Sequence, residues 1–575
     1  MMLKENLRRL IRQGKGAEPA DLVLKNCRVI NVFTREIIYG DVAICDEWIA
    51  GVGNYSGVQE IDCHGYFVSP GFIEGHIHIE SSMLSPDQFV SAVVPCGTTT
   101  VVCDPHEIAN VAGLAGISYI LEETKDLPVA VFVMAPSCVP ATHLETSGAV
   151  LDPDALAELY KHPRVIGLAE MMNYPGVLAG DDTIIEKILR TRDQKMPIDG
   201  HAPGLSGMAL QAYISAGIGS DHECTTREEA LEKLRSGMHL FIREGTVARN
   251  MKELLPVVTE KNVHRCLFVT DDCHPRELQK SGHLDRILRK AIGLGLDPLM
   301  AIQMVTINVA RYFQLCGRGA IGPGYRADIV LFADLREPKP CHVISGGRLI
   351  VEHGVVKEKI EPACNREGDV FHSVRIQWDK VRFAVPAGKG RMRVIRLIKD
   401  QILTESVEIE ETVKDGLAVA DPGRDLAKIA VIERHRETGR MGVGFVMGFG
   451  LKRGAIAGSV AHDSHNIIVV GMSDRDMELA VKSVATAGGG LAVVADNRVL
   501  SLLQLEVAGL MSTCSLREVN ERLDELLVAT RKLGRCDDNV FMLMSFLALP
   551  VIPHLKITDY GLIDVDTFKQ VGLWL

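Results

Sequence analysis

The strongest constraint on the fold is a regular alternation of short apolar runs and helical patterns through the middle of the sequence. The apolar runs are rich in Val, Ile and Phe, and each is followed by polar residues, Gly or Pro; they lie near 67–72, 98–104, 129–136, 165–171, 197–202, 219–223, 239–244 and 265–272. Helical patterns such as DPDALAELYKH and TREEALEKLRSG separate them. Eight β/α repeats in a segment of this length predict a (β/α)8 barrel.

Segments of β character flank this region on both sides. Residues 21–68 and 326–357 carry Val/Ile runs broken by Gly, Asn and Asp, which predicts one small β-sandwich built from both flanks. From about residue 370 strands and helices mix again, which predicts an additional C-terminal α/β domain. The predicted fold class is α/β. The sandwich is expected to comprise residues 1–68 and 318–365, the barrel residues 69–317, and the C-terminal domain residues 370–575.

Composition narrows the class of partner. The formal net charge of −11 argues against a nucleic-acid surface, because phosphate binding needs clustered Lys and Arg. The 14 cysteines form no C-x-x-C pair, and the first residues contain no apolar segment typical of a secretory signal. The longest apolar stretch, Phe541–Ile552, is too short to span a bilayer. We therefore expect a cytoplasmic protein without membrane or nucleic-acid partners.

The predicted strand ends carry metal-ligand side chains. In a barrel of this kind the active site lies at the C-terminal ends of the strands. In order these ends supply His76, His78, Glu170, His201, His222 and Asp271. Both histidines of GHIH point to the same side of a regular strand, so one ion can bind both imidazoles. Four imidazoles with two carboxylates predict a hydrolytic metal site rather than structural zinc, which favours cysteine.

Several runs of sequence resemble a known family. PGFIEGHIHIESSM and GAIGPGYRADIVLF resemble the amidohydrolase superfamily, and LAEMMNYPGV, FVTDD, SVAHDSHNIIVVG and LEVAGLMS resemble its adenine deaminases. The resemblance implies two divalent ions, with manganese or iron expected and zinc able to replace them. His76, His78 and Asp271 would hold one ion, His201 and His222 the other, and Glu170 would bridge them. Asp272 competes with Asp271, because the register at a strand end is not fixed by sequence.

The reaction implied is the hydrolysis of adenine to hypoxanthine and ammonia, with metal-activated hydroxide attacking C6. Asp271 is the expected base, and Glu80 and Asp272 are alternatives. Glu80, Asp104, His106 and Asn173, in the loops after the first four strands, are the expected purine contacts. Arg243 and Glu244, at the end of the seventh strand, are weaker candidates.

Other functions remain as alternatives. A cyclic-amide hydrolase of the hydantoinase or dihydroorotase type would carry a lysine in the fourth strand, where VIGLAEMMN has none. A cytidine-deaminase site needs P-C-x-x-C, and Pro95-Cys96 leads only into GTTT. A non-catalytic scaffold should lack part of the ligand set, which is complete here. His462 and His465 fit either a capped turn or a lid or oligomer contact near the mouth of the barrel. A homo-oligomer is expected from the prevalence of such assemblies.

Overall fold

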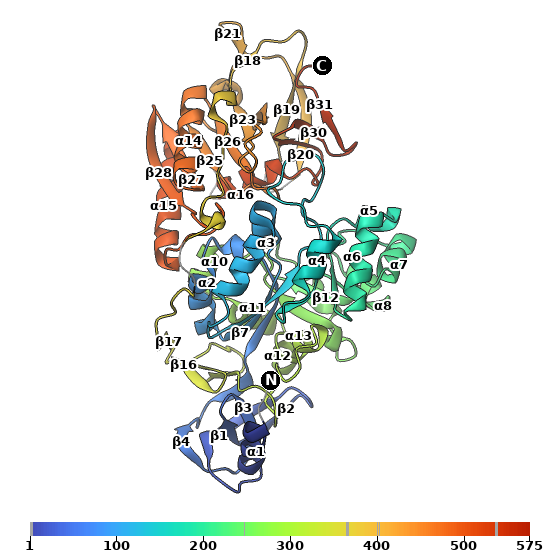
Figure 1. Ribbon diagram of the computed structural model, residues 1–575, viewed down its shortest axis with the longest axis vertical. Helices are drawn as coiled ribbons and strands as arrows, with labels where there is room; N and C mark the ends of the chain where they lie inside the picture. Colours follow the sequence, from blue (N-terminus) through green and yellow to red (C-terminus); the bar gives the residue numbers. More distant parts are fainter. Residues whose placement is uncertain (1–3, 247, 364–366, 399–400, 402, 535–538) are drawn as a thin grey trace.

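The computed structural model describes residues 4–246, 248–363, 367–398, 401, 403–534 and 539–575. Three regions follow one another along its longest axis (Figure 1). The N-terminal sheet lies at one end, the alternating β/α region lies in the middle, and residues 367–575, here called the C-terminal region, lie at the other end. No helix among the described residues is long and apolar enough to cross a membrane.

The N-terminal sheet joins both flanks of the middle region. It has nine strands: β1 (Ala20–Asn31), β2 (Glu36–Cys45), β3 (Trp48–Gly53), β4 (Gly57–Asp62), β5 (Phe67–Pro70), β14 (Ile329–Phe332), β15 (His342–Ser345), β16 (Arg348–Glu352) and β17 (Val355–Val356). The flanks meet where β5 and β14 pair antiparallel, with Val68 opposite Leu331. Helix α1 (Lys4–Gly14) packs against β2 and β3. Both flanks therefore contribute to one sheet, while their arrangement as a sandwich stays a prediction.

The middle region contains eight parallel strands, named here with their helices the parallel core. The strands are β6 (Phe72–Ile77), β7 (Thr98–Cys103), β8 (Ala130–Ala135), β9 (Val165–Met171), β10 (Ile198–Gly200), β11 (Ser220–Asp221), β12 (His239–Arg243) and β13 (Cys266–Val269). β6 to β10 form one parallel sheet and β11 to β13 another. Every residue of β6, β7 and β13 is buried, as expected for parallel strands that are covered on both faces.

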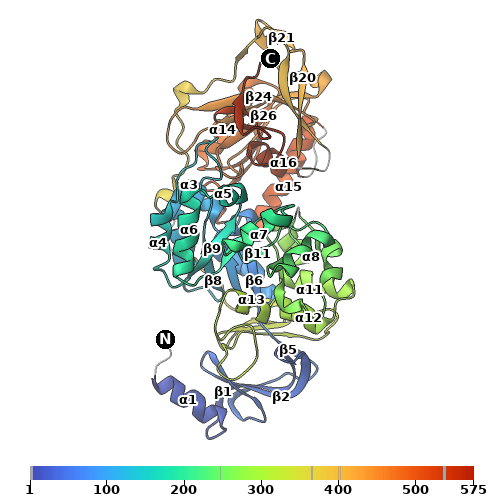
Figure 2. The same ribbon diagram turned by 90° about the vertical axis from the view of Figure 1, so that its right-hand side faces the viewer.

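Backbone hydrogen bonds link the two sheets at both junctions. The Asp271 N–H donates to the His76 carbonyl at 2.9 Å, and the Gly219 N–H donates to the Ile198 carbonyl at 2.9 Å. Gly200 allows the close approach of β10 and β11, because a Cβ there would lie 2.2 Å from the Ser220 carbonyl oxygen. The combined sheet therefore curls, and helices lie around its outside (Figure 2).

Helices of the parallel core begin where the sequence supplies caps. Asp152, Asp181 and Asp297 each accept hydrogen bonds from the first-turn N–H groups of the helices they precede. The helices are α2 (Pro86–Val93), α3 (His106–Glu123), α4 (Pro153–Leu159), α5 (Tyr174–Ala179), α6 (Asp182–Asp193), α7 (Gly207–Ser215), α8 (Arg227–Arg235), α9 (Met251–Leu254), α10 (Pro275–Ser281), α11 (Leu284–Gly293), α12 (Pro298–Met304) and α13 (Ile307–Tyr312). These caps fix where the loops that carry the site begin and end.

One strand differs from the prediction. The run near 67–72 was expected to be the first strand of the barrel, and the sandwich was expected to end at residue 68. Instead β5, which reaches Pro70, belongs to the N-terminal sheet, and the first strand of the parallel core, β6, starts at Phe72. The cause is the break at Pro70-Gly71, where the Gly71 N–H bonds to the Asp328 carbonyl and the chain passes from one sheet to the next.

The C-terminal region is built on an eight-stranded mixed sheet. Its order is β20-β19-β24-β23-β26-β25-β27-β28, with β19 (Met392–Leu397), β20 (Thr404–Ile409), β23 (Leu426–Ile432), β24 (Met441–Met447), β25 (Ala455–Gly458), β26 (Ile467–Gly471), β27 (Gly490–Ala495) and β28 (Arg498–Gln504). Helices α14 (Asp474–Thr486), α15 (Leu516–Leu533) and α16 (Val540–Ser545) pack against it. Smaller sheets comprise β18 (Val385–Pro386), β21 (Val413–Lys414) and β22 (Leu417–Ala418), and β29 (Leu555–Thr558), β30 (Gly561–Asp564) and β31 (Lys569–Val571). A capping box of Ser515 and Glu518 starts α15.

The C-terminal region covers the carboxyl ends of the parallel strands. Ser512 exchanges backbone hydrogen bonds with Met83 and Ser85, in the loop after β6, at 2.8 Å each. The Asp559 carboxylate accepts from the N–H and the hydroxyl of Thr146, in the loop after β8. This end of the parallel core is therefore where a site and the C-terminal region meet.

Candidate metal centre

The six predicted ligands lie together at the carboxyl ends of the parallel strands. His76 lies in β6 and Glu170 in β9. His78, His201 and His222 directly follow β6, β10 and β11, and Asp271 is the second residue after β13. All are buried except His201, whose side chain is 26% exposed. Five of the six contribute nitrogen and oxygen atoms to two overlapping groups that could each hold a metal ion, His76 with His222 and Asp271, and Glu170 with His201 and His222.

Glu170 occupies the middle of the cluster. Its Oε1 lies 3.4 Å from His78 Nε2, while its Oε2 lies 2.7 Å from His201 Nδ1 and 3.1 Å from His222 Nε2. The two oxygens therefore face different sets of imidazoles. A carboxylate placed in this way can bridge two cations.

Asp271 faces the histidines of β6. Its Oδ1 lies 3.2 Å from His78 Nε2 and 3.9 Å from His76 Nε2. Its backbone is left-handed, with φ +59°, a conformation that is uncommon outside glycine and recurs at functional sites. Asp272 instead accepts a hydrogen bond from the Ser81 hydroxyl. Of the two competing carboxylates, the structure therefore places Asp271 in the cluster.

The histidines of β6 are oriented for a cation. His78 Nδ1 lies 3.0 Å from the Asp104 carbonyl oxygen, which can only accept, so Nδ1 carries the proton and Nε2 presents a lone pair to the cluster. His76 Nε2 is buried and has no hydrogen-bond partner. A cation between these nitrogens and Asp271 would satisfy both, so the residues present fit a metal.

The charges of the cluster also suit cations. Burial by itself raises the pKa of Glu170, but the His201 and His222 imidazoles hold that pKa well below its usual range. Burial likewise opposes ionisation of Asp271, and His78 and Arg243 hold its pKa well below the ordinary value. Two buried carboxylates are thus kept ionised. When divalent cations bind, they would balance the negative charge of these carboxylates in place of the protons on the imidazoles.

The predicted substrate contacts have different surroundings. His106 Nδ1 lies 3.1 Å from Asp104 Oδ2 and 3.7 Å from Glu170 Oε1, so Asp104 and His106 adjoin the cluster. His78, Asp104, His106 and Glu170 form a further group that could hold an ion. The Asn173 side chain accepts the Gly176 N–H at 3.0 Å and caps α5. Capping of α5 is therefore enough to explain the position of Asn173.

Two further residues belong to the cluster, and one of them was missed from the sequence. Glu223 Oε1 lies 3.4 Å from His222 Nε2 and 3.6 Å from His201 Nδ1. Arg243 joins Glu223 to Asp271, with 2.8 Å between Arg243 Nη1 and Asp271 Oδ2. The signal for Glu223 was its place directly after His222 at a strand end. Arg243 was considered only as a purine contact, and Glu244 pairs with Lys290 instead.

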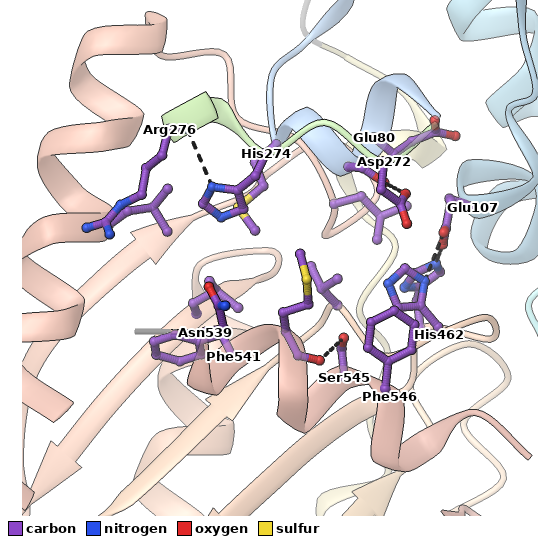
Figure 3. A pocket seen from close by; sticks show the side chains of 18 of the residues that line it. Glu80, Glu107, Asp272, His274, Arg276, His462, Asn539, Phe541, Ser545 and Phe546 are labelled. Atoms are coloured by element: carbon purple, nitrogen blue, oxygen red, sulfur yellow. Dashed lines mark hydrogen bonds and ion pairs between the residues drawn. The ribbon is translucent and has the colours of Figure 1, made fainter. Parts of the chain in front are cut away.

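A cavity, partly open to solvent, lies between the carboxyl-end loops of the parallel core and the C-terminal region (Figure 3). Glu80, Glu107 and Asp272 line its core side, and the opposite wall includes His462, Leu510, Met542 and Phe546. Glu80 Oε1 accepts the Ile108 N–H at 3.0 Å, whereas Oε2 is buried and has no partner. Burial raises the pKa of Glu80 to about 7. Of the predicted substrate contacts, only Glu80 lines this cavity; Asp104, His106 and Asn173 do not.

His462 and His465 bind the core through one carboxylate. Glu107, at the start of α3, is 2.9 Å from His462 Nδ1 and is hydrogen-bonded to His465 Nε2. Burial alone would lower the pKa of His462, but Glu107 raises it to about 9, while burial lowers the pKa of His465 to about 4. The sequence left two interpretations open for these histidines, a capped turn or a contact near the mouth of the barrel. Their bonds to Glu107 favour the second.

Comparison with known proteins agrees with this geometry. A model described as "Amidohydrolase family" matches residues 67–350, and one described as "Adenine deaminase C-terminal domain" matches residues 401–569. "Adenine deaminase 2" of Carboxydothermus hydrogenoformans is 50% identical over 98% of this chain and 99% of its own length. "Adenine deaminase" of Desulfatibacillum aliphaticivorans is 48% identical over 98% and 99% of the two chains, and that of Kosmotoga olearia 46% over 99% of each.

Parallel strands with a histidine and carboxylate cluster at their carboxyl ends define a hydrolase of the amidohydrolase class, which uses divalent metal ions. Within this class, the full-length matches show that the chain belongs to the adenine deaminase family.

Proposed function

We propose that this chain catalyses the hydrolysis of adenine to hypoxanthine and ammonia. Family membership supports the substrate, and the position of Glu170 between His78 on one side and His201 and His222 on the other supports the chemistry. We also propose two divalent ions, one held by His76, His78 and Asp271 and the other by His201 and His222, with Glu170 between them. The contacts of Asp271 with His76 and His78, and of Glu170 with His201 and His222, support this assignment. Manganese or iron is the proposed metal, since these ligand types accept both as well as zinc.

We further propose that the eight parallel strands form one closed (β/α)8 barrel. The bonds from Asp271 to His76 and from Gly219 to Ile198 support this closure. The proposed units are then a sandwich from residues 1–71 and 318–365, a barrel from 72–317 and a C-terminal domain from 370–575. The first limit follows the pairing of β5 in the N-terminal sheet.

When bound, the two metal ions would supply a water molecule with a pKa near 7. Asp271 is assigned as the base that takes one proton of this water as its oxygen attacks C6 of adenine, and that passes the proton to the leaving amine. The other water proton ends on ring nitrogen N1, so that adenine and water give hypoxanthine and ammonia. Glu80 is assigned to hold a proton at the ring edge, because its Oε2 is buried and has no other partner.

Arg243 has a positioning role in this scheme. Its contact with Asp271 Oδ2 leaves Oδ1 directed at the histidines of β6. Because Arg243 favours the ionised carboxylate, Asp271 is ready to accept a proton when the reaction starts. Glu223 in turn accepts hydrogen bonds from both Nη1 and Nη2 of the same guanidinium.

The test is turnover by protein reconstituted with manganese and analysed for metal content. We expect ammonia and hypoxanthine from adenine, with no turnover of adenosine or dihydroorotate run in parallel. Two bound metal ions without adenine turnover would refute the substrate, and turnover of dihydroorotate would favour a cyclic-amide hydrolase. Asp271→Asn and Glu80→Gln, measured at equal metal content, test the two assigned residues.

A further inference from the structure

The cavity described above has two chemically different walls. The core wall carries three acidic residues, Glu80, Asp272 and Glu107, beside the basic side chains of His274 and Arg276 (Figure 3). Glu80 lies two residues after His78 and Asp272 directly after Asp271, so this wall continues the metal cluster. The Glu107 carboxylate is 3.7 Å from His106 Nε2, which gives a second link to the cluster.

The opposite wall comes from the C-terminal region and is mostly apolar. Phe546, Leu510, Leu491 and Met542 contribute to it. The His462 ring stacks on Phe546, with 4.9 Å between ring centroids and 23° between ring planes. A pair of stacked aromatic rings therefore stands across the cavity from Glu80 and Asp272.

Glu107, His462 and His465 have the composition of a third metal site, but hydrogen bonds account for them. His465 Nδ1 accepts the Ala461 N–H at 3.2 Å, so the proton of the neutral ring lies on Nε2, which donates to Glu107. His462 Nδ1 donates to the other oxygen of the same carboxylate. These three residues fix the C-terminal region against the cavity.

We infer that the purine base binds in this cavity, so that Phe546 and His462 of the C-terminal region form one wall of the substrate site. The inference rests on the proposed function. A purine has apolar faces that stack on aromatic rings and a polar edge that carries N–H donors, and the two walls match these two properties. Glu80 is only 4% exposed and its Oε2 has no hydrogen-bond partner, which leaves this carboxyl group to bond to that edge.

The test compares two C-terminal phenylalanines in the manganese-loaded full chain. Phe546→Ala removes the stacking surface. Phe371→Ala is the matched control, because Phe371 is also half-buried and packs edge-on against Tyr119 of α3, 6.0 Å between centroids, outside the cavity. KM and kcat for adenine, the inhibition constant of hypoxanthine and the metal content are measured for both and for His462→Ala.

We expect Phe546→Ala to raise KM for adenine and the inhibition constant of hypoxanthine by the same factor, roughly 10-fold, because stacking on an aromatic ring contributes to the binding of every base. His462→Ala should shift both constants in the same direction, and Phe371→Ala should leave them unchanged at equal metal content. If wild-type protein deaminates adenine while Phe546→Ala and His462→Ala keep wild-type constants and full metal, the inference is wrong and the proposed function stands. If wild-type protein does not act on adenine, both fall.

Discussion

The two regions that flank the parallel core meet it at opposite ends. The N-terminal sheet continues directly into β6 through Gly71, and its Asp328 carboxylate bonds to Arg318, which also reaches Thr100 near the start of β7. The C-terminal region instead contacts the loops that follow the strands, through Glu107 and the loop after β6. In such folds the amino ends of the strands serve stability, while the carboxyl ends carry the chemistry. Changes at the two ends should therefore separate stability from catalysis.

The largest effect is expected inside the metal cluster. Glu170→Gln removes the charge between the two groups of histidines, so we expect metal content to fall and kcat/KM for adenine to drop by roughly 10³-fold or more. Elemental analysis and steady-state kinetics measure both. Retention of two metal ions with near wild-type turnover would remove Glu170 from the bridging position.

A smaller loss is expected where the C-terminal region meets the core. Glu107→Gln keeps the size of the side chain but removes the charge that His462 and His465 share. We expect kcat/KM to fall by about 10- to 100-fold, the range seen when supporting contacts of a metal site are removed, with metal still bound. An unchanged kcat/KM in folded protein would show that this contact serves the fold alone.

The matching change at the other end should alter stability only. Asp328 is 6% exposed and accepts hydrogen bonds from Arg318, Arg326 and the Gly346 N–H. Asp328→Asn leaves the Arg318 guanidinium without its carboxylate, while Arg326 keeps Glu47, and we expect a loss of about 3 kcal/mol in the free energy of unfolding. Thermal unfolding should show a lower midpoint, while KM and kcat of the folded protein stay at wild-type values. A changed KM would mean that the amino ends of the strands also influence the site.

The smallest effect is expected at the surface between the core and the C-terminal region. Arg276 pairs with Asp524, whose side chain is 71% exposed, and exposed pairs contribute about 0–1 kcal/mol. Asp524→Ala should leave kcat/KM within about two-fold of the wild-type value and the unfolding midpoint nearly unchanged. A loss as large as that of Glu107→Gln would show that the surface pair, and not the buried carboxylate, positions the C-terminal region.

The metal cluster could be predicted from the sequence because its residues sit at strand ends, and the period of a strand fixes the direction of His76 and His78. The start of β6 could not, since Phe67–Pro70 pairs with β14, a strand about 260 residues away along the chain. Glu223 was within reach, because it follows His222 at a strand end. Phe546 was considered only as part of an apolar stretch, and its place across from Glu80 depends on packing between regions far apart in sequence.

The two walls of the cavity differ in how well they can be predicted from the sequence, because one depends on neighbouring loops and the other on distant segments. The core wall is set by short loops after strands whose order follows the chain. The C-terminal wall depends on how His462 and His465 meet Glu107, more than 350 residues earlier in the sequence. A pattern along the chain can indicate the first arrangement, whereas the second requires the folded structure.

A crystal structure of the manganese-loaded protein with bound hypoxanthine would test the account most directly. We predict two ions with Glu170 between them, and the purine ring in the cavity with its edge at Glu80 and one face on Phe546. A purine bound instead on the far side of Glu170, beside His201 and Glu223 and out of contact with the C-terminal region, would contradict it.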